Sequence, residues 1–97
     1  TPDDIAMLEG LGLEALYLDY TEPDSIAACA DKVHEMTNGQ LDVLFNNGAY
    51  GLAGALEDIS REALTVQFQT NVFGWHELTN LVIPIMRQHN EGRIIQN

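Results

Sequence analysis

Cysteine, basic residues and long apolar runs are scarce in this chain of 97 residues. Cys29 is the single cysteine, which excludes an internal disulfide, and we expect a small buried side chain there rather than a catalytic thiol. Only 4 lysine and arginine residues stand against 15 acidic ones, and the resulting charge of -11 disfavours nucleic acid and anionic membranes as partners. No apolar run approaches the roughly 20 residues that span a bilayer. We therefore expect a cytoplasmic protein with no nucleic-acid or membrane partner.

An initiating methionine is also absent, and the chain stops directly after an apolar segment, residues 93–96. The length allows one domain at most, because domains usually have about 100 to 200 residues. The composition, 45% apolar and 20% charged, is that of a globular protein. We expect both ends to be cut, so that residues 1–97 are the central part of a single larger domain.

Helical and strand patterns alternate along the chain. Thr1 and Thr21 are predicted helix N-caps, each with an aspartate three residues later as in a capping box. The predicted elements are, in order, a helix from Thr1 to about Gly10, a strand over 13–18, a helix from Thr21 to about Gly39, a strand over 41–46, a helix from Ser60 to about His89 and a strand over 93–96. This alternation predicts an α/β fold with a parallel sheet.

The long predicted helix carries an apolar stripe, a proline and an asparagine. We expect the stripe to face the core; it comprises Leu64, Phe68, Val72, Trp75, Leu78 and Val82. Pro84 should kink or interrupt the helix, because proline removes a backbone donor. Asn71 lies beside the stripe, where a buried amide needs hydrogen-bond partners. Its type leaves two roles open: a structural amide bonded to a neighbouring carbonyl, or an amide that holds a water chain for proton transfer.

Polar segments follow two of the predicted strands. Asp19-Tyr20-Thr21 comes after the first, and residues 46–51 come after the second. Parallel α/β sheets bind ligands at the carboxyl ends of their strands. Asn47-Gly48 is also a hairpin-turn signal, but the small residues that follow are untypical of a returning strand. We therefore favour a cofactor rim whose small residues let a flat ligand approach the backbone.

Three segments, in this order, resemble the middle of the short-chain dehydrogenase/reductase family: Leu18-Asp19-Tyr20-Thr21, Asn46-Asn47-Gly48-Ala49-Tyr50-Gly51 and Asn71-Val72-Phe73-Gly74. The interval of 24 residues from Asn47 to Asn71 is typical of the family. Neighbouring residues resemble its hydroxysteroid- and retinol-dehydrogenase-like members. These proteins are single-domain, NAD(P)-dependent oxidoreductases with a Rossmann fold. The resemblance implies an enzyme that uses NADP or NAD to interconvert an alcohol and a carbonyl on a hydrophobic, steroid- or retinoid-like substrate.

The resemblance also implies roles for single residues. Asp19 would contact the adenine amino group, and Tyr20 would supply backbone beside the adenine ring. Asn71 would be the catalytic asparagine that holds a water linked to the active-site lysine. Asn46 would tie the central strands together. The adenosine ribose and the approach to the nicotinamide would be lined by Asn47, Gly48 and Ala49.

Two departures from the family pattern bear on activity. The family usually reads Asn-Asn-Ala-Gly, whereas Gly48 and Ala49 stand in reverse order here. If the second of these positions needs a positive φ, Ala49 costs about 1 kcal/mol. The glycine-rich phosphate turn, the catalytic serine and the Tyr-x-x-x-Lys motif lie outside these residues. We expect the chain alone to be inactive, and the alternative is a catalytically dead dinucleotide-binding sensor or scaffold.

The strand order of the family, 3-2-1-4-5-6-7, has a consequence for the fold. The predicted strands at 13–18, 41–46 and 93–96 would be strands 3, 4 and 5, an incomplete Rossmann-like parallel sheet with flanking helices. The first two would lie about 14 Å apart, which is three strand spacings. We expect this gap rather than direct pairing of the two strands.

The long helix of this family also packs against a neighbouring subunit. We expect a homo-oligomer through residues 61–89, with contacts from side chains off the core stripe: Val66, Phe73, Leu81, Ile83 and Ile85. The histidines lack metal-ligand spacing, so we expect no metal site. The expected partners are a small-molecule alcohol or carbonyl substrate and a second copy of the protein.

Overall fold

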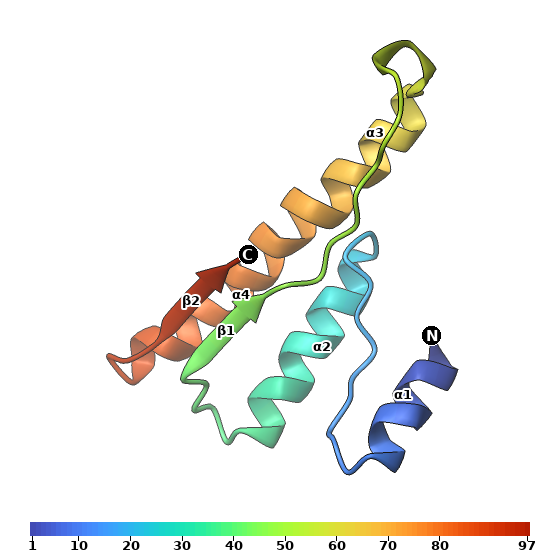
Figure 1. Cartoon of the computed structure of the whole chain (residues 1–97). Coiled ribbons are helices and arrows are strands. Elements are labelled where there is room, and N and C mark those ends of the chain that lie inside the picture. Colours follow the sequence, from blue (N-terminus) through green and yellow to red (C-terminus); the bar gives the residue numbers. More distant parts are fainter.

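The computed structural model describes residues 1–97, and helices and strands alternate along it (Figure 1). A short 3-10 helix and a π-helical turn accompany the main elements. The elements are α1 (Pro2–Gly10), α2 (Pro23–Met36), β1 (Val43–Asn46), η1 (Leu56–Asp58), α3 (Arg61–Phe68), the π-helical turn η2 (Gln69–Phe73), α4 (Gly74–Gln88) and β2 (Arg93–Gln96). β1 and β2 pair in parallel, with Val43 opposite Arg93. The predicted α/β class with a parallel sheet is confirmed.

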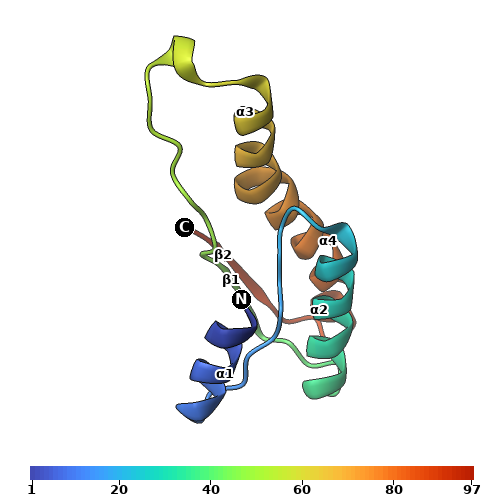
Figure 2. The ribbon, with the colours of Figure 1, turned by 90° about the vertical axis from the view of Figure 1, so that its right-hand side faces the viewer.

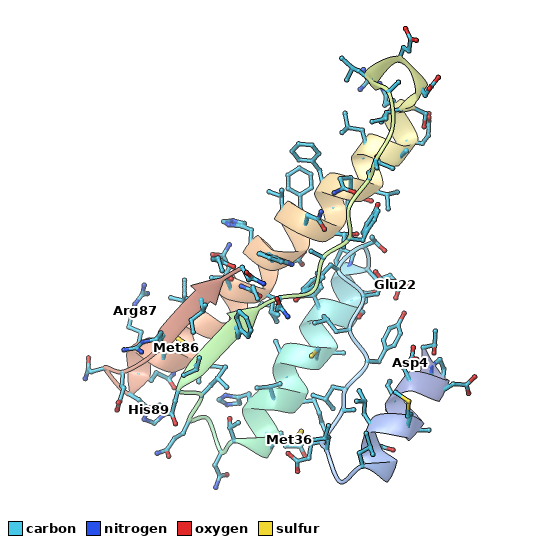
Figure 3. The ribbon with its side chains drawn as sticks, in the orientation of Figure 1. Asp4, Glu22, Met36, Met86, Arg87 and His89 are labelled. Atoms are coloured by element: carbon cyan, nitrogen blue, oxygen red, sulfur yellow. The ribbon has the colours of Figure 1, made fainter.

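The core lies where α2 and α4 pack on each other and on β1. Its buried side chains come from the two helices: Ile26, Ala30, Leu78, Val82 and Met86. Met86 lies at the end of α4 that is next to the start of β2, near Arg87 and His89 (Figure 3). α1 lies on the other side of residues 13–18 from α2 (Figure 2). Only 8 of 97 residues are buried, and the radius of gyration is 15.4 Å, against about 13 Å for a compact domain of 100 residues. Close packing is therefore confined to one part of the chain.

Residues 13–18, a predicted strand, run extended between α1 and α2 without a strand partner (Figure 1). A β-strand requires backbone hydrogen bonds to a neighbour, and the sheet consists of β1 and β2 alone. The prediction of a strand there is wrong for this chain, whereas the expectation that 13–18 does not pair with β1 is confirmed. Residues of both segments, among them Leu18 and Phe45, line an apolar groove of about 240 Å³.

The starts of the first two helices follow different rules. Thr1 caps α1 as predicted, and its hydroxyl oxygen accepts a hydrogen bond from the backbone N–H of Asp4. α2 begins after Glu22, which makes no side-chain cap. The predicted capping box at Thr21 is wrong, because the Thr21 hydroxyl donates instead to the carboxylate of Asp19 at 2.7 Å. An ionised carboxylate is the stronger acceptor, so it determines where this hydroxyl points.

The long helix predicted over 61–89 consists of α3 and α4 joined by the π-helical turn η2. Pro84 lies inside α4, so the interruption that was one of its two predicted effects is absent. Proline removes one backbone donor, but Val82 and Met86 on either side of it are buried in the core and hold the helix in place. The helix therefore changes from α-helical to π-helical near Asn71, whereas it stays α-helical through the proline.

The apolar stripe of this long helix is buried only in its second half. Leu78 and Val82 are 6% and 2% exposed. In the first half, three side chains are each 47% exposed: Leu64, Phe68 and Val72. The prediction that the stripe faces the core is correct for α4 and wrong for α3 and η2, because the loop that contacts this part of the helix leaves these three side chains uncovered.

Candidate functional site

Three chain segments meet at the carboxyl end of β1: the turn at Asp19-Tyr20, the loop after Asn46 and the start of α4. The Tyr20 ring lies so close to Gly48 that a Cβ atom on Gly48 would be 2.8 Å from Tyr20 Cε2. Trp75 Nε1, in the first turn of α4, donates to the carbonyl oxygen of Gly48 at 2.6 Å. The hairpin alternative for Asn47-Gly48 is excluded, because the next strand pairs with β1 in parallel.

Asp19 forms a tight turn and keeps one oxygen free. Its Oδ1 accepts hydrogen bonds from the hydroxyl and the backbone N–H of Thr21, at 2.7 and 2.8 Å. The hydroxyl bond, followed by the backbone bond, holds the pKa of Asp19 below its usual value. Asp19 N–H donates to Ser25 Oγ at 2.7 Å, which fixes the turn to α2. Since Oδ2 bonds to no other group of the chain, an ionised oxygen remains available to a ligand.

Tyr20 contributes its side chain to the site as well as its backbone. The ring packs against the buried core cluster of α2 and α4, and burial raises the pKa of the phenol. Gly74, the first residue of α4, is buried beneath it, and a Cβ atom on Gly74 would overlap the Tyr20 side chain and its carbonyl oxygen. The predicted role of Tyr20 concerned its backbone only, and this side-chain contact gives no signal in the sequence.

Asn47, Gly48 and Ala49 are exposed along the loop that leaves β1. Asn47 Oδ1 accepts a hydrogen bond from Asn97 Nδ2, which links the carboxyl ends of the two strands. Neither Gly48 nor Ala49 has a positive φ. The cost of about 1 kcal/mol that a positive φ would impose on Ala49 is therefore absent. Gly48 instead lies close to the Tyr20 ring, which a Cβ atom at this position would overlap.

Asn71 anchors this loop to the helix through both of its amide atoms. Its Nδ2 donates to the carbonyl oxygen of Tyr50 at 2.8 Å, and its Oδ1 accepts from the Tyr50 N–H at 3.2 Å. Gln67 Nε2 donates to the same carbonyl at 2.9 Å. The structural bonding that was one of the two predicted roles is thus present. Each amide atom of Asn71 keeps one further hydrogen-bonding position, because an amide has two donors and two lone pairs.

The helix is π-helical at Asn71. η2 contains this residue, and the Gly74 N–H donates to the carbonyl oxygen of Gln69, five residues back. Turns of this kind are rare and occur frequently at functional sites. Asn71 is therefore distinguished both by its bonds to the loop and by the helix geometry around it.

Asn46, the last residue of β1, is fully buried. Its Nδ2 donates to Thr79 Oγ1 of α4 at 3.1 Å, while its Oδ1 has no partner. The expectation was a tie between strands, and the bond observed joins the sheet to the helix that covers it. A buried amide oxygen without a donor is costly, so this position is ready to accept a further hydrogen bond.

Four residues make contacts at the site that the sequence did not predict: Gln67, Gly74, Trp75 and Thr79. Trp75 was predicted as a core residue of the apolar stripe, yet its indole N–H bonds to the loop. These residues act on partners 17 to 54 positions away along the chain. Local patterns such as helical periodicity carry no information on such distant pairs.

No three or more His, Cys, Asp or Glu side chains lie close enough together to hold a metal ion. None of the helices has the length and apolar character needed to cross a bilayer.

Known proteins resemble this chain over nearly all of its length. The family model of short chain dehydrogenases matches residues 4–96. The uncharacterized oxidoreductase YbbO of Escherichia coli is 38% identical over 94 residues, which cover 97% of this chain and 35% of that protein. Retinol dehydrogenase 8 of Homo sapiens is 37% identical over 89 residues, covering 90% of this chain and 27% of that protein.

A solved structure agrees with these relatives. 7α-Hydroxysteroid dehydrogenase complexed with NADH and 7-oxo glycochenodeoxycholic acid is similar with a TM-score of 0.78 and 26% identity, covering 95% of this chain and 36% of that one. The chain thus spans 27% to 36% of the length of these proteins. The family model covers every segment of the site described above. The chain therefore belongs to the short-chain dehydrogenase family.

Proposed function

We propose that residues 1–97 carry the adenine-side cofactor contacts and the catalytic asparagine of an NAD(P)(H)-dependent oxidoreductase that interconverts an alcohol and a carbonyl. The observation that supports this most is the meeting of three segments at the carboxyl end of β1. Tyr20 lies against Gly48, and Asn71 bonds to Tyr50 of the same loop. Segments that are separate in sequence thus form one rim, in the place where parallel sheets bind ligands. We also propose that they are the central part of a single Rossmann-type domain.

The residues of this rim suit a dinucleotide. Asp19 is ionised and keeps Oδ2 free, so it would accept a hydrogen bond from the adenine amino group. The exposed Asn47, Gly48 and Ala49 would line the ribose, because the last two place no bulky side chain on the surface. When bound, NAD(P)(H) supplies or accepts the hydride.

Asn71 would hold a water molecule for proton transfer. Its amide is fixed in orientation by the backbone of Tyr50, with one N–H and one lone pair left over. A fixed amide positions a water without first losing rotamer freedom, which is the property required of a proton relay. The structural bond and the proposed catalytic role are therefore compatible in one side chain.

We propose a hydrophobic substrate of the steroid or retinoid kind. Two relatives support this class, namely retinol dehydrogenase 8 and the 7α-hydroxysteroid dehydrogenase complexed with 7-oxo glycochenodeoxycholic acid. Residues 1–97 alone would be inactive, since the catalytic serine and the Tyr-x-x-x-Lys motif of the family lie outside them. A cytoplasmic location remains the prediction from composition.

The alternative is a sensor or scaffold of the same fold that binds a dinucleotide without turnover. The reversed order of Gly48 and Ala49 was the observation behind it. Because Ala49 has no positive φ, this order does not strain the loop. The alternative therefore has less support than the enzyme.

We further propose a homo-oligomer through the helix over 61–89. Three of the side chains predicted for this contact are exposed by 40% or more: Val66, Phe73 and Leu81. Ile83 and Ile85 are partly buried, so the contact would centre on α3, η2 and the first part of α4. Sedimentation of the full-length protein with and without a Phe73→Asp substitution tests this: the variant should dissociate, and a monomeric unsubstituted protein would overturn the proposal.

Coenzyme titration and an assay of carbonyl turnover together distinguish the proposed enzyme from the alternative sensor. The fluorescence of NADH and NADPH would be followed as each is titrated with the full-length protein, and oxidation of the bound coenzyme would then be measured with retinal and with a ketosteroid. The enzyme predicts saturable binding and turnover of at least one carbonyl. Binding without turnover favours the sensor, and no binding of either coenzyme would overturn both.

A further inference from the structure

We propose that Tyr20 is a positioning residue for the cofactor loop, residues 47–51, and that its ring makes glycine obligatory at position 48. The role predicted for Tyr20 from the family resemblance concerns its backbone, so a role of its side chain goes beyond that prediction. The inference rests on the proposed cofactor function only for its binding readout, because the packing on which it depends is independent of any ligand.

The Tyr20 side chain is held at its base by the helix behind it. A Cβ atom on Gly74 would lie 2.7 Å from the carbonyl oxygen of Tyr20 and closer still to the Cβ atom of Tyr20. The backbone of Gly74 belongs to α4, which is anchored in the core by Leu78 and Val82. The base of the side chain therefore cannot retreat, and the ring can move only by rotating out of its contact with the core cluster.

The ring is also held at its far edge by the loop. A Cβ atom on Gly48 would lie 2.8 Å from Cε2 and 3.5 Å from Oη of Tyr20. The first distance is well below the roughly 3.5 to 4.0 Å at which carbon atoms pack. The loop cannot give way easily, because the Gly48 carbonyl accepts the Trp75 indole N–H from the same helix. Gly48 is thus clamped between Tyr20 and Trp75.

This clamp accounts for the reversed order of the two small residues. Ala49 is exposed and lacks a positive φ, so its backbone imposes no requirement for glycine. At position 48 the requirement comes from Tyr20 and not from backbone conformation, since the φ of Gly48 is not positive either. The ring at position 20 and the glycine at position 48 are therefore a coupled pair.

A double-mutant cycle in the full-length protein tests this coupling. The variants are Gly48→Ala, Tyr20→Ala and the double variant, with Tm and the Kd for NADH and NADPH measured for each. Gly48→Ala should lower Tm and weaken coenzyme binding about tenfold, as expected for an overpacked contact. Tyr20→Ala should itself lower Tm, because a half-buried ring is lost. When Gly48→Ala is added to Tyr20→Ala, the double variant should have a Kd within threefold of that of Tyr20→Ala and the same Tm as Tyr20→Ala.

Two controls separate the clamp from general damage to the fold. Gly54→Ala, beyond this loop in the same connection between β1 and η1, places its Cβ at an ordinary 3.7 Å from Ile59 and should leave both readouts unaltered. Tyr20→Phe keeps the ring, so Gly48→Ala should remain as harmful in that background. If Gly48→Ala does not fold, recovery of folded protein by Tyr20→Ala supports the clamp.

Additive effects in the cycle, or a harmless Gly48→Ala in the presence of Tyr20, would overturn the clamp. If the unsubstituted protein bound neither coenzyme, the proposed function would fail. The Tm values of the cycle would then still show whether Tyr20 and Gly48 are coupled, so that failure of the clamp and failure of the proposed function are distinguishable.

Discussion

The two halves of the long helix carry the same apolar pattern and have different surroundings. In α4, Leu78 and Val82 are nearly fully buried against α2 and β1. Leu64 and Phe68 in α3 and Val72 in η2 continue the stripe but are each 47% exposed. Helical periodicity thus identifies which face of a helix is apolar, whereas burial depends on which other segment covers that face.

The contacts in the two halves also differ in kind. The α4 half is held mainly by apolar packing, to which Trp75 and Thr79 add one hydrogen bond each with the end of β1 and the loop after it. The half formed by α3 and η2 is joined to the loop over 47–51 by polar bonds with Tyr50, whose carbonyl oxygen accepts from Gln67 and Asn71 and whose N–H donates to Asn71. Substitutions in the α4 half should therefore act on stability. Substitutions in the half formed by α3 and η2 should act mainly on coenzyme binding and turnover.

A charge in the apolar stripe should show the largest difference. Leu78→Asp places an unpaired carboxylate in the core and should lower the free energy of unfolding by at least about 3 kcal/mol. Leu64→Asp, at an equivalent position of the stripe in α3, should cost less than about 1 kcal/mol. Urea unfolding measures both, and equal losses would contradict the division of the helix into a buried and an exposed half.

Substitutions of two asparagines, one in η2 and one in α4, test the expected difference in their effect on turnover. Asn71→Ala should lower kcat about 100-fold or more, because it removes the proposed proton relay together with the anchor of the loop. Asn80→Ala is the matched control, since that side chain bonds only to the exposed His76. Steady-state kinetics of the full-length protein measures both. A kcat of Asn71→Ala close to that of the unsubstituted protein would limit the residue to structural bonding.

Glycine substitutions test the packing of the α4 half. A Cβ atom on Gly92 would meet Met86, including Cγ at 2.5 Å, and Met86 is buried. Gly92→Ala should therefore destabilise by about 1 to 3 kcal/mol. Gly10→Ala meets no atom within 4 Å at the end of α1 and should be neutral or slightly stabilising. Thermal unfolding decides, and an unchanged Tm for Gly92→Ala would show that Met86 moves aside freely.

The smallest expected effect concerns Asp19 and pH. The pKa of Asp19 is lower in the folded protein than its ordinary value, chiefly through the Thr21 hydroxyl. Its contribution to stability is thus present above the unfolded pKa, near 4, and is lost as pH falls through the folded pKa. Thr21→Val should raise the pKa of Asp19 toward its ordinary value. Carboxyl NMR titration measures this, and an unchanged pKa would assign the shift to the backbone N–H alone.

Much of the fold was predictable because it depends on local chemistry. The Thr1 cap, the helix start near Arg61 after Ser60 and the strand ending at Asn46 all follow from residue type and periodicity. The extended but unpaired state of residues 13–18 was not predictable, because an extended segment becomes a strand only when it pairs with a neighbouring strand. The cap at Thr21 failed for a related reason, since Asp19 competes for its hydroxyl.

The candidate site was predictable in its residues and not in its contacts. Asp19, Asn47 and Asn71 stood out through their place after strands or on an apolar helix face. That Asn71 bonds to Tyr50 and that Tyr20 lies over Gly48 depends on the path of the chain between them. Tertiary packing sets that path, and it places the constraint on Gly48 through the Tyr20 ring and not on the backbone of Ala49.

One titration tests whether these segments form a dinucleotide site. Fluorescence titration of the full-length protein with NADH and NADPH would be compared for the unsubstituted protein, Asp19→Ala and the exposed control Asp31→Ala. The account predicts saturable binding, about tenfold weaker in Asp19→Ala through loss of one hydrogen bond to a charged acceptor, and unchanged in Asp31→Ala. Absence of binding, or equal affinity in all three proteins, would contradict it.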